Sequence, residues 1–455
     1  MKYIDFDWNS DARVLGVSLS AFDRLGLSEH LPHYEIITAA DDNWHDQLRK
    51  NGTQVTSCGM KQFVNVSELL ASTCVSDHVA DLKKEGVSPL FLITNVTDKA
   101  QLSAKRLDVP LLANPVPLRQ QFENKAQIRE SSSLHTLFAR FIIRSRSQLD
   151  EARSFEQLKQ EFFPFVIQNE SEQLSGSRGT AVVYSLPDYM SFLERMRGKG
   201  GDRFVISEYI TGQPYSVQGC VTSSGVYWAP VQRQIVSDPW LASPGFSQFC
   251  GGLWGEDSLN TVAFYQVAER VGQVMKQRGY KGIFGIDFLV EPSGKVYVIE
   301  VNARLTGMTP VLSMMQNKHG IPPLLLLHVL EHARVPYTLK NDEEYKQKLR
   351  QVASLSYAVL HNRKPYSVQN TGNLRSGIYT FEDNTLQYIR AGYTISDLQS
   401  ESEFLIPDAP NHSIAAGKML IRVLTSRAMW SPSRELLPTY QQLIKTIESY
   451  FEKVV

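Results

Sequence analysis

Three oxygen-bearing side chains, Asp287, Glu300 and Asn302, interrupt an otherwise apolar and β-forming stretch of the chain. The stretch reads GIFGIDFLVEPSGKVYVIEVNARLTG (282–307) and predicts two strands joined by a tight turn at 291–294. Polar residues are expected in such a turn, so their presence within the strands suggests a chemical role. Because side chains alternate between the two faces of a strand, Glu300 and Asn302 share one face.

Strand pairing is expected to bring Asp287 to the same place. With Val290 and Lys295 as partners across the turn, position 287 falls opposite position 298. Asp287 then lies one diagonal step from Glu300, and diagonal neighbours in a sheet are roughly 7–8 Å apart. Two desolvated carboxylates so close repel each other, and a hard divalent cation, Mg²⁺ or Mn²⁺, offsets that cost. The hairpin therefore predicts a metal site; the alternative is a hairpin whose polar face is turned to water.

A glycine- and serine-rich loop between two strand-like segments is a second candidate site. The segment FPFVIQNESEQLSGSRGTAVVYS (163–185) predicts a hairpin whose tip exposes backbone N–H groups. Such a tip can bind an anion, and hydroxyl and guanidinium groups add donors and positive charge. No GK[ST] follows, so this is not a Walker loop, and a flexible hairpin turn is the alternative. The loop residues are Ser175, Gly176, Ser177, Arg178, Gly179 and Thr180.

Two further segments are candidate binding segments only because of their order in the chain. The strand RFVISEYITGQPYSV (203–217) ends where backbone groups and apolar walls suit a purine ring, although by itself it is an ordinary strand end. Lys125 lies near the start of a helix expected at about 119–136, where a surface lysine is the alternative. The residues at the end of the strand are Glu208, Tyr209 and Ile210.

These segments need a scaffold, and residues 1–118 predict a small α/β domain in front of it. Strand-like and helix-like segments alternate there, which is typical of a parallel sheet. The segment lacks GxGxxG, so a dinucleotide site is not supported. Pro115 and Pro117 mark its end. The strand-like segments are 2–6, 34–39 and 89–95, and the helix-like segment is 97–107.

Residues 119–340 contain all the candidate site residues and are expected to form a second domain, with a lobe at about 140–212. Apolar residues recur at helical spacing over about 258–278, so a helix precedes the acidic hairpin. Residues 341–455 are β-rich and close with a helix, which predicts a third, α+β domain. The expected fold class is therefore a multidomain α/β and α+β protein.

The composition limits the classes of function. Of 455 residues, 42% are hydrophobic and 21% are charged, as in an ordinary globular protein. Lys+Arg and Asp+Glu both number 47, so no broad basic surface for nucleic acid is expected. No apolar run reaches the length of a membrane span, and the N-terminus has no signal-peptide core. The four cysteines form no CxxC pair, and we expect reduced thiols in a cytoplasmic protein.

Taken in chain order, the lysine, the glycine loop, the strand, the helix and the acidic hairpin resemble the ATP-grasp family. The resemblance covers about residues 119–320. It is closest where an acidic residue, Asp287, precedes the Glu-x-Asn-x-Arg run that begins at Glu300. It implies a fold in which two α+β lobes clamp ATP between them, behind an N-terminal Rossmann-like domain.

The resemblance also implies a role for each matched residue. Lys125 would contact a phosphate group, the loop at 175–180 would fold over the β- and γ-phosphates, and residues 208–210 would line the adenine pocket. Arg304 would face the transferred phosphoryl group and the acyl substrate. The ligands of Mg²⁺ (or Mn²⁺) would be Asp287, Glu300 and Asn302. The substrate side would be formed by Arg233, Arg304, Thr306 and Gly307.

Two positions depart from the family pattern. The usual second lysine, at the end of the strand before the loop, is Gln168 here, which donates a hydrogen bond but brings no charge. Arg178 is a candidate for supplying that charge instead. The acidic residue that often binds ribose is Pro214, which puts a ribose contact at that position in doubt. Arg233, named above for a substrate carboxylate, has a structural ion pair as its alternative role.

The function that the resemblance implies is an ATP-dependent carboxylate–amine ligase acting through an acyl phosphate, with release of ADP and phosphate. Phosphoryl transfer needs positioning and charge stabilisation more than a protein nucleophile, which suits the residues present. The partners would be a small carboxylic acid and an amine such as an amino acid, and a homodimer is conceivable. One alternative is a carboxylase or thioester-forming ligase of the same family. The other is a nucleotide-binding regulatory protein without catalysis, which is suggested by Gln168 in place of the usual lysine.

Overall fold

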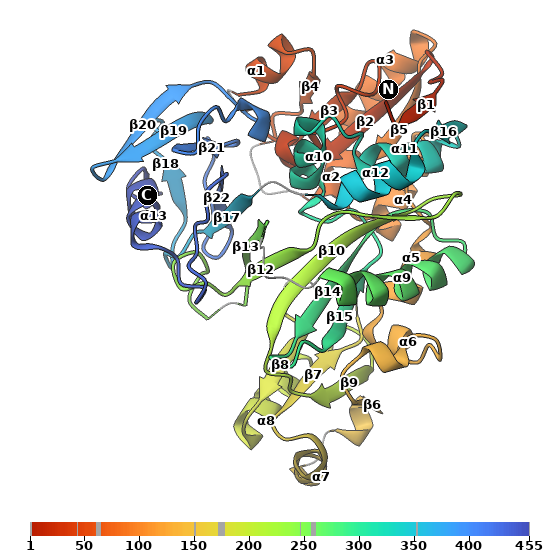
Figure 1. Cartoon of the computed structure of the whole chain (residues 1–455), viewed down its shortest axis with the longest axis vertical. Coiled ribbons are helices and arrows are strands. Elements are labelled where there is room, and N and C mark those ends of the chain that lie inside the picture. Colours follow the sequence, from red (N-terminus) through yellow and green to blue (C-terminus); the bar gives the residue numbers. More distant parts are fainter. Residues whose placement is uncertain are drawn as a thin grey trace.

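The chain is described by a computed structural model (Figure 1). The described residues are 2–42, 44–60, 65–149, 152–171, 178–245, 247–255, 261–351 and 354–454. The N-terminal part lies at the top right, a four-stranded lobe lies at the bottom, and the C-terminal part lies at the left of Figure 1. This mixed α/β and α+β architecture confirms the expected fold class.

A parallel four-stranded sheet forms the core of the N-terminal part, as predicted. The predicted first strand at 2–6 is wrong in its place, because β1 (Ile4–Phe6) pairs with β16 (Tyr337–Leu339) outside this sheet. Residues Ala12–Ser18, for which no strand was expected, take the central position. The sheet order is β4 (Gln54–Ser57), β3 (Glu35–Thr38), β2 (Ala12–Ser18) and β5 (Ser88–Leu92), with helices α1 (His45–Lys50), α2 (Val66–Leu70), α3 (Thr73–Lys84) and α4 (Asp98–Arg106).

The lobe is an antiparallel sheet with its helices packed on one face. Phe165 and Ile167 point into the hydrophobic core beneath those helices. Strand alternation therefore turns Gln168, on the same strand, toward the opposite face. The sheet order is β6 (Phe141–Ser145), β9 (Arg203–Glu208), β7 (Phe165–Asn169) and β8 (Thr180–Val183), and the helices are α7 (Ala152–Phe162) and α8 (Leu186–Arg195).

An eleven-stranded sheet joins the acidic hairpin to the C-terminal part. Because β13 pairs directly with β17, the strands on either side of the predicted boundary at 340/341 belong to one sheet. That boundary and the one at 118/119 stay predictions. The sheet order is β15 (Val296–Asn302), β14 (Gly282–Val290), β10 (Gln213–Val221), β12 (Gln232–Val236), β13 (Phe249–Trp254), β17 (Leu355–His361), β22 (Met419–Thr425), β21 (Glu403–Ile406), β19 (Gly377–Glu382) and β20 (Thr385–Arg390), with β11 (Val226–Trp228) beside β10.

Helices cover the sheet around the hairpin. Helix α9 (Thr261–Gln277), expected at about 258–278, packs Phe264 and Met275 against Ile286 and Phe288 of β14. The side chains that alternate with these two on β14 therefore face the other way. The remaining helices are α10 (Thr309–Lys318), α11 (Leu324–Ala333), α12 (Asp342–Arg350) and α13 (Pro438–Glu448), and the remaining strands are β18 (Val368–Asn370) and β23 (Phe451–Lys453).

The single helix expected at about 119–136 is wrong. Two short helices stand there, α5 (Val116–Glu123) and α6 (Lys125–Arg129). Asn124 ends the first and caps the second, because its Oδ1 accepts hydrogen bonds from the backbone N–H of Ala126 (3.0 Å) and of Gln127 (2.9 Å). The cap places Lys125 at the first position of α6.

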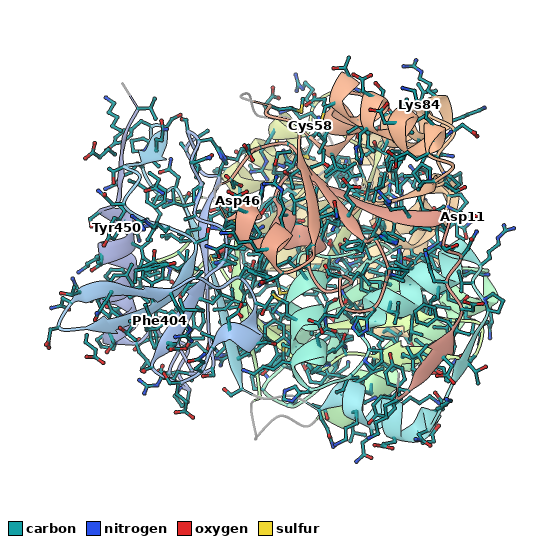
Figure 2. All side chains as sticks on the ribbon, turned by 90° about the horizontal axis from the view of Figure 1, so that it is seen from above. Asp11, Asp46, Cys58, Lys84, Phe404 and Tyr450 are labelled. Atoms are coloured by element: carbon teal, nitrogen blue, oxygen red, sulfur yellow. A yellow bond between two sulfur atoms is a disulfide. The ribbon has the colours of Figure 1, made fainter. Side chains whose placement is uncertain are left out.

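The prediction of four reduced thiols is wrong for two of them. Cys58 and Cys74 form a disulfide in the N-terminal part, where Figure 2 labels Cys58. Cys220 and Cys250 are buried, and burial raises the pKa of the Cys250 thiol to about 11, so it is protonated at neutral pH. The cytoplasmic location stays a prediction. Every helix among the described residues is too short or too polar to cross a bilayer.

Candidate active site

A cavity of about 590 Å³ lies between the acidic hairpin, the lobe, the end of α5 and the start of α6. Its size is in the range of small-molecule and cofactor sites. Both charged and neutral polar side chains line it, together with apolar ones. The lining includes Thr94, Glu123, Lys125, Gln168, Thr180, Pro214, Gln218, Gln232, Gln234, Phe249, Trp254, Asp287, Leu289, Glu300, Asn302, Arg304, Thr306 and Gly307.

The hairpin brings its three oxygen-bearing side chains into this cavity, but not by the expected register. Val290 pairs with Val296 rather than Lys295, so the turn has one more residue than expected. That change alone would set Asp287 opposite Ile299, on the wrong face from Glu300. A β-bulge after Asp287 restores the face, because Ile299 has no partner on β14 and Asp287 pairs directly with Glu300.

Asp287 is held by two amide donors. Its Oδ1 accepts a hydrogen bond from Gln234 Nε2 (2.9 Å), and its Oδ2 accepts one from Asn302 Nδ2 (3.1 Å). Burial, and next the charge of Glu300, raise the pKa of Asp287 to about 7, against the lowering effect of the two hydrogen bonds. At Asp287 the two raising effects therefore outweigh the hydrogen bonds and the charge of Arg304, as expected for a buried carboxylate that faces another carboxylate.

This pair makes the stability of the metal-free protein depend on pH. Because the pKa of Asp287 is raised on folding, its contribution is full below about pH 4 and is lost as the pH rises through 7. We expect the wild-type free energy of unfolding, measured by urea denaturation with a chelator, to fall from pH 5 to pH 8. The expected fall relative to Asp287→Asn is on the order of 2 kcal/mol. Parallel pH profiles for the two proteins would contradict this assignment.

Lys125 and Arg304 bring positive charge to the same cavity. Lys125 Nζ lies 3.5 Å from Glu300 Oε2, and the lysine is 9% exposed. Arg304 Nη1 donates to Glu123 Oε1 (2.7 Å), and the other Glu123 oxygen pairs with Arg119. Burial alone would lower the pKa of Arg304, but the charges of Glu123, Glu300 and Asp287 raise it overall. Arg304 therefore carries its charge at any working pH.

The structure describes three of the six predicted loop residues. Ser175, Gly176 and Ser177 lie outside the described residues. Of the rest of the loop, Thr180 lines the cavity, whereas Arg178 is exposed and is not part of the lining. The backbone carbonyl of Gly179 accepts a hydrogen bond from the N–H of Asn169 (2.8 Å), which closes the base of the loop. Gln168 is buried and lines the cavity, with its Nε2 donating to Thr180 Oγ1 (3.3 Å).

Some predicted residues are not brought to the cavity. Arg233 is buried on β12, but Gln232 and Gln234 beside it line the cavity, so strand alternation turns Arg233 to the other face of the sheet. The predicted adenine-pocket residues lie at the end of β9 outside the lining. There Glu208 Oε1 accepts from the backbone N–H of Arg140 (2.9 Å). These residues are Glu208, Tyr209 and Ile210.

Several residues of the site were not anticipated, and four of them contact the predicted ones directly or through one another. Glu123 and Gln234 line the cavity, and Arg119 and Arg129 contact residues that do. Arg129 follows Lys125 by four residues, which places the two side chains on one side of a helix. That spacing was readable from the sequence. The contact of Gln234 with Asp287 was not, because it joins strands 53 residues apart in the chain.

The side chains fit a magnesium ion with a bound polyanion. No group of three or more His, Cys, Asp or Glu side chains suited to a metal occurs among the described residues. The hairpin instead offers two carboxylates and one amide oxygen, a partial ligand set that Mg²⁺ completes with water and substrate oxygens. The cations of Lys125 and Arg304 suit the remaining negative charge of a phosphate chain.

Comparison with known proteins agrees with this geometry. The ATP-grasp domain family matches residues 153–308, a span that includes the hairpin and all of the lobe except β6 and the start of α7. One 46-residue segment is 44% identical to the [butirosin acyl-carrier protein]–L-glutamate ligase of Niallia circulans. That match covers 10% of this chain and 11% of the length of the ligase, so the likeness concerns a short segment of both proteins.

Solved structures share the fold over nearly the whole chain. Biotin carboxylase of Campylobacter jejuni, crystallised as a β,γ-ATP complex, has a TM-score of 0.58 at 13% identity, covering 91% of this chain and 87% of its own. The L-amino acid ligase of Bacillus licheniformis has a TM-score of 0.54 at 12% identity, covering 98% of this chain and 99% of its own. At these identities the likeness establishes the fold.

Proposed function

We propose that this chain, whose residues 153–308 match the ATP-grasp domain family, is an ATP-dependent carboxylate–amine ligase that makes a peptide or amide bond. The observation that carries the proposal is the convergence of Asp287, Glu300 and Asn302 with Lys125 and Arg304 on one cavity. Relatives that include ligases for an amino acid and for glutamate support the choice of a carbon–nitrogen bond. The cofactors proposed are ATP and Mg²⁺, or Mn²⁺.

In the proposed reaction a substrate carboxylate oxygen attacks the γ-phosphorus of ATP, and the bond from that phosphorus to the ADP oxygen breaks. The amine nitrogen then attacks the acyl carbon, phosphate leaves, and the nitrogen loses a proton. The metal ion supplies charge neutralisation on the phosphate oxygens. Asp287, Glu300 and Asn302 would hold it, and Lys125 would contact a phosphate oxygen.

Arg304 is proposed to stabilise the charge that develops on the transferred group. Its Nη1 is held by Glu123, so its other guanidinium N–H groups can face the reacting oxygens in a fixed orientation. Thr306 and Gly307 line the cavity beside it and are proposed to contact substrate. An acyl phosphate hydrolyses readily, and the loop at 175–180 is the proposed cover that excludes water.

The products of ATP separate this proposal from its rivals. The purified chain is incubated with ATP, Mg²⁺ and pools of amino acids, and the nucleotide products are measured. We expect ADP and phosphate, formed only when both a carboxylic acid and an amine are present. AMP and pyrophosphate would reject the acyl-phosphate scheme, and turnover with bicarbonate in place of the acid would indicate a carboxylase. Tight ATP binding without turnover would indicate a regulatory protein.

A cytoplasmic location and small-molecule substrates complete the proposal. The cavity wall away from the hairpin presents the neutral amides Gln218 and Gln232, and the aromatic side chains Phe249 and Trp254. Such a wall suits a carboxylic acid substrate that carries no charge apart from its reacting carboxylate. A homodimer stays a prediction.

A further inference from the structure

Arg129, at the end of α6, is a buried cation behind the wall of the cavity. It is 4% exposed, and no carboxylate of the described residues lies within ion-pair distance of it. Burial lowers the pKa of its guanidinium to about 10, opposed by the charge of Glu300. Its Nε–H is buried and has no acceptor among the described residues. Burying a charge without an ion-pair partner, and an N–H group without an acceptor, lowers the free energy of unfolding. This cost indicates that Arg129 has a role other than stabilising the fold.

The first contact of Arg129 is with the β-bulge that sets the metal-site register. Its Nη2 donates to the backbone carbonyl of Ile299 (3.1 Å), the residue that has no partner on β14. Without that donor the bulge would leave a partly buried carbonyl to be satisfied elsewhere. The bulge is what sets Glu300 opposite Asp287, so the guanidinium stabilises the arrangement of both carboxylates.

The second contact is with Gln168, the residue that stands where a lysine is usual. The same Nη2 donates to Gln168 Oε1 (3.2 Å), while Nη1 donates to the backbone carbonyl of Lys125 (2.9 Å). Since a guanidinium has no acceptor, the amide oxygen of Gln168 must face it. The amide N–H groups of Gln168 are thereby turned to Thr180 and to the cavity, where they are donors for an anion.

We infer that Arg129 is a positioning residue for the metal-bound triphosphate: one planar guanidinium fixes the bulge at Ile299, the amide of Gln168 and the start of α6. This inference rests on the proposed function, since it concerns the same nucleotide site. It explains how a neutral glutamine can serve at position 168. The Arg129 guanidinium, behind Gln168, supplies the positive charge that a lysine would bring. The amide of Gln168 supplies the hydrogen-bond donor that faces the cavity.

The test measures binding of ATP with Mg²⁺ by calorimetry, together with the Tm of each variant. Arg129→Met removes the charge and the fork at similar volume, and we expect the Kd for ATP to rise about 10-fold or more with a higher Mg²⁺ requirement. Arg129→Lys keeps the charge without the fork and should fall between. Arg278→Met is the matched control: the Arg129 guanidinium lies over the ring of Phe138 and that of Arg278 lies over the ring of Phe122, but Arg278 contacts no residue of the bulge and lies outside the cavity lining.

A second variant keeps the inference testable if Arg129→Met folds poorly. In the wild type, Gln168→Lys sets an ammonium beside the Arg129 guanidinium, so ATP affinity should fall. In an Arg129→Gln background, where the positive charge at position 129 is gone, the same change should cost less affinity. The same fold-change in both backgrounds would overturn the inference, as would an Arg129→Met protein that is folded and binds ATP within twofold of the wild type.

The two proposals can fail separately. If the wild-type chain does not bind ATP with Mg²⁺, the proposed function fails whatever Arg129 does. If the wild type binds and turns over ATP but the Arg129 variants keep its Kd and its Mg²⁺ dependence, only the positioning role fails. A lower Tm with unchanged binding would show that Arg129 is merely structural.

Discussion

Replacing Glu300 by Gln is expected to lower turnover by about 10²-fold or more, measured as ADP formation at saturating ATP and Mg²⁺. The substitution keeps the size of the side chain but removes one of the two carboxylates that face each other across the bulge. It also removes the ion-pair partner of Lys125, 3.5 Å away. Both losses act on the phosphate chain, so the effect should be larger than that of an ordinary surface change.

The matched control for Glu300 is Glu291 in the same hairpin. Glu291 lies in the turn, where it accepts a hydrogen bond from Tyr297 Oη (3.3 Å), and it is not part of the cavity lining. Glu291→Gln should keep turnover within about twofold of the wild type. Near-wild-type turnover of Glu300→Gln would reject the metal assignment, and an equal loss in both variants would place the effect in the stability of the hairpin.

Replacing Arg304 by Met is expected to lower kcat by about 10²- to 10³-fold while changing the KM for ATP less. The reason for the split is that a group facing the transferred phosphoryl acts mainly in the transition state. Arg304→Lys keeps the charge but loses the planar fork, so its kcat should lie between those of the wild type and Arg304→Met. The measurement is steady-state kinetics with varied ATP at a fixed, saturating amine and acid.

The change at Arg304 also leaves Glu123 with Arg119 as its remaining ion-pair partner. A Tm for each variant is therefore needed to separate catalysis from folding. Lys295→Met is the control from the same hairpin, because Lys295 lies over the Tyr297 ring in the turn, outside the cavity lining. A larger rise in KM for ATP than fall in kcat would show that Arg304 binds nucleotide rather than stabilising the transferred group.

The substrate side of the cavity differs in character from the hairpin side. Gln218 Nε2 donates to Thr306 Oγ1 (2.9 Å), and Gln232 accepts from Ser216, so these amides are partly engaged with their neighbours. Arg233, proposed from the sequence to hold a carboxylate, lies on the other face of the sheet. If the substrate has a second carboxylate besides the one that is phosphorylated, that group would therefore have to lie near Arg304 or Lys125. Otherwise we expect a substrate without a second carboxylate.

The sequence by itself determined the shared face of the acidic hairpin. Alternation along a strand is a local property, so Glu300 and Asn302 had to point the same way, and the apolar partners on β14 and α9 had to pack on the other. The strand that carries Gln168 follows from an equally local pattern, whereas the helix start at Lys125 does not, because a single helix was expected over about 119–136. This is why the ATP-grasp resemblance was readable from four short segments.

Only the tertiary structure decided the register and the partners. The turn proved one residue longer than expected, and the bulge at Ile299 added a second shift of one. The two shifts add to two residues, one full period of the strand, so Asp287 returns to the predicted face. A bulge depends on what satisfies its unpaired carbonyl, and that donor, Arg129, comes from a helix 170 residues earlier. Contacts of this kind are set by packing between distant segments, which no local periodicity records.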